Sequence, residues 1–99
     1  MILNEQDNGT EVVVSKGTII EIVLQENPTT GYQWLLKNCD KLELVLDSYV
    51  CSDKRMPPAP GSGGVHTWHF KADNGTITLV NKRAWEQEIK QTFEIKVKV

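Results

Sequence analysis

The chain has 99 residues, which suffices for one domain around one hydrophobic core, and 13 acidic against 11 basic side chains give it a formal charge of −2. It lacks the excess of positive charge that phosphate contacts require, which argues against a nucleic-acid partner. No apolar run approaches the roughly 20 residues that cross a bilayer, which argues against a membrane partner.

The expected compartment rests on the first residues and on the cysteines. Residues 1–7 are too polar for a signal peptide, so we expect a cytoplasmic protein as given, with the secretory or lysosomal pathway open if a leader has been removed. Cys39 and Cys51 are too few for a disulfide framework, and a single pair in a chain without an export signal is more often two free thiols. We therefore expect both thiols to be reduced.

Apolar side chains alternate with polar ones in most segments, which predicts strands with one buried face. In chain order, the apolar sets that share a predicted inward face are Val12 and Val14; Ile20, Ile22 and Leu24; Tyr32, Trp34 and Leu36; Leu42, Leu44 and Leu46; Trp68 and Phe70; Ile77 and Leu79; and Phe93, Ile95, Val97 and Val99. The pattern contains no convincing helix. It predicts an all-β fold, an immunoglobulin-like antiparallel β-sandwich of about seven strands that forms a single domain over residues 1–99.

Two Asn-Gly pairs are candidate tight turns. Asn74-Gly75 lies between predicted strands and is typical of a type I′ turn, in which both central residues have positive φ. Asn8-Gly9 is a similar candidate, so residues 1–9 are expected to form either a flexible end or a hairpin. Both pairs also match the Asn-x-Thr glycosylation pattern, which matters only in a secreted protein.

Three unusual connections should meet at one end of the sandwich. Residues 27–31, 52–64 and 81–88 are alternate connections, separated by short links at 38–41 and 72–75. If each strand crosses the sandwich once, alternate connections lie at the same end. Residues 52–64 have the composition of a long mobile loop. Loops presented together on a rigid scaffold are where such sandwiches usually place recognition.

The first of these connections is conformationally restricted. In Asn27-Pro28-Thr29-Thr30-Gly31, proline fixes its own φ and keeps Asn27 out of the helical region. Gly31 allows a turn that other residues disfavour, and the threonines are stiff at χ1. Such a segment loses little entropy on binding, although an ordinary tight connection between strands has the same composition.

The whole string Asn27-Pro28-Thr29-Thr30-Gly31-Tyr32-Gln33-Trp34 closely resembles the hallmark motif of the chagasin family of cysteine peptidase inhibitors. Gly61-Ser62-Gly63-Gly64 is similar to that family's Gly-x-Gly-Gly motif, and Arg83-Ala84-Trp85 is similar to its third motif, usually Arg-Pro-Trp or Arg-Pro-Phe. Order and spacing agree from about Val12 to Val99. The departure is Ala84 in place of proline, which should soften the third connection.

This resemblance implies a monomeric, reversible, tight-binding inhibitor of papain-like, cathepsin-like cysteine peptidases, with no cofactor and no metal. Thr29, Thr30 and Gly31 would lie beside the peptidase's catalytic cysteine and histidine. Gly63 and Gly64, with Val65, would offer backbone groups for strand-like pairing. Trp85 would be an aromatic anchor supported by Arg83. The expected peptidase-binding residues are Asn27, Pro28, Thr29, Thr30, Gly31, Tyr32, Gly61, Gly63, Gly64, Val65, Arg83 and Trp85.

Two other functions are alternatives to an inhibitor: an enzyme, and a binding module without inhibitory activity. Cys39, Cys51, His66 and His69 would be the candidate residues of an enzyme, but the two histidines are an odd number apart on one predicted strand and should face opposite sides of the sheet. The stronger rival is an adhesion or carbohydrate-binding module, because sandwich folds serve many functions.

Overall fold

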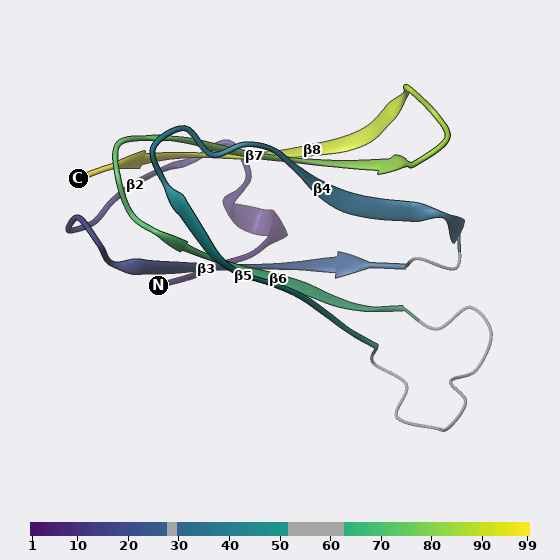
Figure 1. Cartoon of the computed structure of the whole chain (residues 1–99), viewed down its shortest axis with the longest axis horizontal. Helices are drawn as coiled ribbons and strands as arrows, with labels where there is room; N and C mark the ends of the chain where they lie inside the picture. The colour runs from purple at the N-terminus through teal and green to yellow at the C-terminus, as the bar shows by residue number, and fades with distance from the viewer. Residues whose placement is uncertain (28–29, 52–62) are drawn as a thin grey trace.

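A computed structural model describes residues 1–27, 30–51 and 63–99, and shows two four-stranded sheets packed face to face (Figure 1). Sheet A has the order β1-β3-β6-β5 and sheet B the order β2-β8-β7-β4. The strands are β1 (Ile2–Leu3), β2 (Glu11–Val13), β3 (Ile19–Glu26), β4 (Tyr32–Asn38), β5 (Glu43–Cys51), β6 (Gly64–Lys71), β7 (Gly75–Arg83) and β8 (Ile89–Lys98). Among the described residues, no helix is long and apolar enough to cross a membrane. The predicted all-β sandwich is confirmed.

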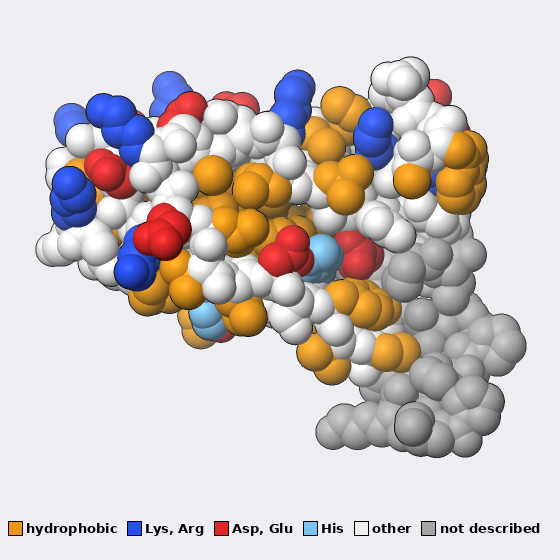
Figure 2. All heavy atoms as spheres, in the orientation of Figure 1, with side chains coloured by type: hydrophobic (Ala, Val, Ile, Leu, Met, Phe, Trp, Pro, Cys, Tyr) orange, Lys and Arg blue, Asp and Glu red, His pale blue; other side chains and the backbone are white. Residues whose placement is uncertain are grey.

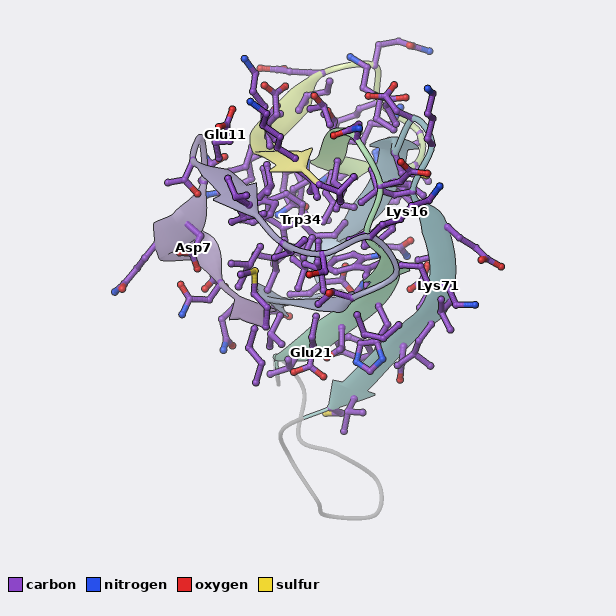
Figure 3. The ribbon with its side chains drawn as sticks, turned by 90° about the vertical axis from the view of Figure 1, so that its left-hand side faces the viewer. Asp7, Glu11, Lys16, Glu21, Trp34 and Lys71 are labelled. Carbon is purple, nitrogen blue, oxygen red and sulfur yellow. The ribbon has the colours of Figure 1, made fainter. Side chains whose placement is uncertain are left out.

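The core lies between the sheets and is built from the alternating apolar positions. On sheet A, Ile20 pairs with Phe70 and Ile22 with Trp68, and all four side chains are fully buried. On sheet B, Ile77, Leu79, Phe93 and Ile95 are buried opposite them. Figure 3 shows Trp34 between the two layers, and its burial, like that of Trp68, confirms the inward placement of both tryptophans.

Two predicted inward positions are wrong. Val99, just beyond the end of β8, is 38% exposed. Leu42 is buried and Leu44 packs against the core, as predicted, but Leu46 is 40% exposed. A bulge between Leu44 and Leu46 shifts the register of β5 against β6, so that Leu46 pairs with His69. Because one extra residue reverses the alternation of side chains, everything in β5 beyond the bulge changes face.

The predicted type I′ turn at Asn74-Gly75 is also wrong. β6 belongs to sheet A and β7 to sheet B, so residues 72–74 cross between the sheets and close no hairpin. Asn74 does not have a positive φ, and its side-chain oxygen accepts a hydrogen bond from the Val99 amide at 3.0 Å. A Cβ at Gly75 would lie 2.6 Å from Cβ of Asp40, so this glycine allows a close approach of the neighbouring link.

The two strands of the first residues pair with different sheets and form no hairpin with each other. β1 pairs in parallel with β3 and β2 pairs in parallel with β8, so each sheet has one parallel pairing at its edge. The described residues form eight strands. A 3₁₀ helix (Glu5–Asp7), capped by Asn4, joins the two strands. Asn8 fixes this segment to β8, since it donates to the Thr92 carbonyl and accepts from the Glu94 amide.

Candidate functional site

The described parts of the three unusual connections lie at one end of the sandwich, as the parity of the strands predicts. They join β3 to β4, β5 to β6 and β7 to β8, and Figure 1 shows them at the end away from both chain termini. Pro28, Thr29, Gly61 and the predicted mobile loop, apart from Gly63 and Gly64, lie outside the described residues.

The first connection closes in a tight turn. The Asn27 carbonyl accepts hydrogen bonds from the Thr30 amide at 3.3 Å and from the Thr30 hydroxyl at 2.9 Å. Gly31 follows with a φ of +85°, a conformation that disfavours residues with a Cβ. Thr30 is therefore held at both its backbone and its side chain, two residues before the start of β4 at Tyr32.

The indole of Trp85 packs against the backbone of Gly31. Trp85 is 72% exposed, yet a Cβ built on Gly31 would lie only 2.4 Å from Cη2 and 3.1 Å from Cζ2 of this ring. The contact joins the first connection to the third. Sequence reasoning gives Gly31 a role in the turn and in peptidase binding but misses its contact with Trp85, because the two residues are far apart in the sequence.

Arg83 makes the second link between these connections. Its Nε donates to the Thr30 carbonyl at 3.1 Å, and its Nη1 donates to Oε1 of Glu86 at 3.0 Å. The hydrogen bond to Glu86 is the main cause that raises the pKa of Arg83 above its usual range. The guanidinium carbon also lies 4.4 Å from the ring centroid of Tyr32, and Lys90 Nζ lies 4.5 Å from the same centroid, so Tyr32 makes cation–π contacts with both.

Ala84 lies in a turn that closes without proline. The Glu86 amide donates to the Arg83 carbonyl at 3.1 Å, which makes residues 83–86 a hydrogen-bonded β-turn with Ala84 at its second position. Proline is favoured there because its fixed φ suits the turn. The side-chain bond between Arg83 and Glu86 fastens the same turn, so the expected softening at Ala84 is opposed by two hydrogen bonds.

In the second connection, the two described glycines differ in their surroundings. A Cβ on Gly63 would lie 3.5 Å from the Glu26 carbonyl oxygen, so Gly63 runs beside the end of β3. Gly64 is buried in β6, and a Cβ there would lie 2.3 Å from the Val50 carbonyl oxygen. Gly64 and Val65 are flanked by β3 and β5 on either side, so the expected strand-like pairing with a partner does not fit these two residues.

The residues considered for an enzyme do not converge. The His66 ring lies 3.0 Å from a carboxylate oxygen of Glu26 and stacks on the Trp68 ring, whereas His69 lies 2.7 Å from Glu21 on the other face of sheet A. The prediction that the histidines face opposite sides is therefore confirmed. Cys39 and Cys51 are both free thiols, and each donates to a backbone carbonyl.

Replacing Gly31 tests the packing of Trp85. Gly31→Ala and the matched control Gly17→Ala should each lower the free energy of unfolding by about 1–2 kcal/mol, because both glycines have a φ of +85°. Only Gly31→Ala should also move the indole, since nothing lies within 4 Å of a Cβ at Gly17. The measurement is the Trp85 indole N–H resonance beside a denaturant titration, and an unchanged resonance in Gly31→Ala would contradict the contact.

Replacing Ala84 tests the turn. Ala84→Pro should raise the free energy of unfolding by about 0.4–1 kcal/mol, because proline restricts the unfolded chain at a turn position that accepts its φ. Arg83, as the last residue of β7, already has the extended backbone that a residue before proline requires. Chemical denaturation gives the change, Ala84→Gly should shift stability in the opposite direction, and a loss of stability in Ala84→Pro would show that the turn is of another kind.

Comparisons with known proteins identify the family of this chain. A sequence model described as the chagasin family of peptidase inhibitors, I42, matches residues 13–97. Amoebiasin-1 of Entamoeba histolytica is 37% identical over 105 aligned positions that cover 100% of this chain and 99% of that protein. Chagasin of Trypanosoma cruzi is 30% identical over 84 positions, covering 79% of this chain and 76% of chagasin.

A solved structure extends the likeness to the fold. The crystal structure of EhICP2, a cysteine protease inhibitor from Entamoeba histolytica, superposes with a TM-score of 0.81 and 26% identity, over 99% of this chain and 93% of that one. The family consists of inhibitors of peptidases and not of enzymes with a catalytic site of their own. With a family match from residue 13 to residue 97 and relatives aligned over most of its length, this chain belongs to the chagasin family of peptidase inhibitors.

Proposed function

We propose that this chain is a reversible, tight-binding inhibitor of papain-like, cathepsin-like cysteine peptidases, and that it blocks the active-site cleft with the three connections at one end of the sandwich. The observation that carries the proposal is that Thr30, Gly31, Arg83 and Trp85 contact one another and leave Thr30 and Trp85 exposed, in a member of an inhibitor family. The family supports inhibition of a peptidase, and these residues supply a surface for it.

The first connection is proposed as the wedge that enters the cleft, through Asn27, Pro28, Thr29, Thr30 and Gly31. Its described part explains how it would resist cleavage. A thiolate attacks a carbonyl carbon whose oxygen is directed into an oxyanion hole. The Thr30 carbonyl oxygen instead accepts a hydrogen bond from Arg83 of the same chain, which holds it toward the third connection. The wedge would therefore fill the cleft without placing this peptide bond in line for attack.

Trp85 is proposed as the anchor of the third connection. Large exposed aromatic side chains contribute strongly to binding when they become desolvated in a pocket of the partner. Trp85 is 72% exposed and already packed on Gly31, so it would lose little rotational freedom on binding. Arg83 and Tyr32 are proposed to support this surface.

The second connection is proposed to flank the cleft on the other side through Gly61 and Gly63. Gly64 and Val65 would contribute by setting the course of the chain into β6, because their places are inside sheet A. We propose a monomer, because one chain supplies all three connections. We also propose a cytoplasmic location, since free Cys39 and Cys51 are the state that a reducing compartment maintains.

Two substitutions, at Thr30 and at Trp85, test the proposal. The wild-type chain should inhibit papain at nearly stoichiometric concentration. Trp85→Ala should raise the inhibition constant about 30-fold, equal to about 2 kcal/mol, through the loss of an aromatic anchor. Thr30→Asp should weaken inhibition by about tenfold or more, because it would bury an unpaired carboxylate in the cleft. The measurement is residual peptidase activity against inhibitor concentration.

The matched control is Val13→Ala, which truncates an apolar side chain of β2 that is 70% exposed and lies outside the three connections. It should leave the inhibition constant unchanged, and circular dichroism should show that every variant is folded. Full papain activity at a large molar excess of the wild-type chain would end the proposal and favour an adhesion or carbohydrate-binding module. An unchanged constant in Trp85→Ala would remove Trp85 from the proposed surface.

A further inference from the structure

A buried carboxylate lies beneath the first two connections, outside the three motifs. Glu26 is the last residue of β3, is only 7% exposed, and projects to the inner side of sheet A together with Leu24. An unpaired carboxylate in this position would be costly, because burial removes its hydration. Its contacts therefore show what the carboxylate stabilises.

One oxygen of Glu26 binds residues that follow two different connections. Oε1 accepts a hydrogen bond from the Trp34 amide at 2.5 Å and lies 3.0 Å from His66 Nδ1. Trp34 belongs to β4, after the first connection, and His66 belongs to β6, after the second. Glu26 thus joins the end of β3 to two other strands. These are β4, which follows the first connection, and β6, which follows the second.

The imidazole of His66 extends this cluster to a fourth strand. Its Nε2 contacts Oδ1 of Asp47 in β5, the strand that leads into the second connection, and its ring stacks on Trp68 with centroids 3.9 Å apart. Figure 2 shows a histidine side chain (pale blue) with an acidic side chain (red) on either side on this face of the molecule. The strands on both sides of both connections are therefore tied to one cluster, Glu26–His66–Asp47.

The cluster also adjoins the described residues of the connections themselves. Glu26 precedes Asn27, whose carbonyl closes the turn at Thr30. Glu26, Asn27, Thr30 and Gly63 line a common pocket of about 250 Å³. A displacement of the Glu26 side chain would therefore shift the neighbouring residues of the first connection, Asn27 and Thr30, and Gly63 of the second.

The geometry points to Glu26 as a positioning residue for inhibition: through Trp34 and His66 it fixes the spacing between the first and second connections. This inference rests on the proposed function, which it deepens. A well-packed apolar side chain would often stabilise the fold as well as the buried Glu26 carboxylate and its partners do. β3 and β6 are already paired neighbours in sheet A, so the directional hydrogen bonds to this oxygen add the place of β4, from sheet B, relative to both.

Glu26→Ala and Glu26→Gln separate positioning from simple stability. Alanine removes the acceptor of both contacts, so the inhibition constant for papain should rise about tenfold or more, the range expected when hydrogen bonds to a charged group are lost. Glutamine retains a side-chain oxygen that accepts from the Trp34 amide and from His66, so inhibition should return to within about threefold of wild type. A residue that only stabilises the fold would lower the unfolding temperature while leaving the inhibition constant of the folded protein unchanged.

Glu21→Ala is the matched control. Glu21 lies on the same strand and contacts the other histidine, His69, at 2.7 Å, but on the outer face of sheet A and away from the connections. It should leave the inhibition constant unchanged. If Glu26→Ala does not fold, Glu26→Asp takes its place, because the shorter side chain cannot reach both partners in their present positions.

The amide resonances of Thr30, Gly31 and Gly63 in the free protein give a second measurement that needs no peptidase. They should shift in Glu26→Ala or Glu26→Asp, and remain near their wild-type positions in Glu26→Gln and Glu21→Ala. A folded Glu26→Ala or Glu26→Asp protein with wild-type resonances and a wild-type inhibition constant would overturn the inference. If the wild-type chain does not inhibit papain, the proposed function fails. In that case the positioning role is tested by the amide resonances alone, and wild-type resonances in folded Glu26→Ala or Glu26→Asp overturn it.

Discussion

The hydrogen bond from Arg83 to the Thr30 carbonyl is the interaction on which the proposed inhibitory surface depends. It joins two connections that are far apart in the sequence, and the packing of Trp85 on Gly31 joins them again a few ångströms away. Neither link needs a bound partner. The entropy of ordering Thr30, Gly31, Arg83 and Trp85 is therefore lost when the chain folds, so it does not oppose association with a peptidase.

Stability and function make different demands on this end of the sandwich. The apolar core between the sheets sets the fold, but near the connections the inner face of sheet A carries Glu26 and His66 in line with Leu24 and Trp68. Polar contacts replace apolar packing there. Burial removes the hydration of these polar groups, but their hydrogen bonds fix the orientation of the side chains that they join. The same chemistry recurs at Arg83, whose charge is shared between a carbonyl, a carboxylate and two aromatic rings.

Periodicity and motif order are local signals, and they predict what depends on local sequence. Alternation places Ile20, Ile22 and Leu24 in the core, and strand parity brings the three connections to one end. Leu46 is misplaced because a bulge leaves no mark in the alternation. Asn74-Gly75 fails as a hairpin turn because the change of sheet is a property of topology. The Glu26–His66–Asp47 cluster escapes sequence reasoning, since its members come from three strands and their spacing matches no motif.

The rate at which the catalytic thiol of papain is alkylated shows whether the chain covers that thiol without being cut. Papain saturated with the chain should react with iodoacetamide far more slowly than free papain, and should regain its activity on dissociation from a chain that mass spectrometry shows to be intact. Alkylation at the rate of the free enzyme while the chain is bound would contradict the account, as would cleavage between Thr30 and Gly31.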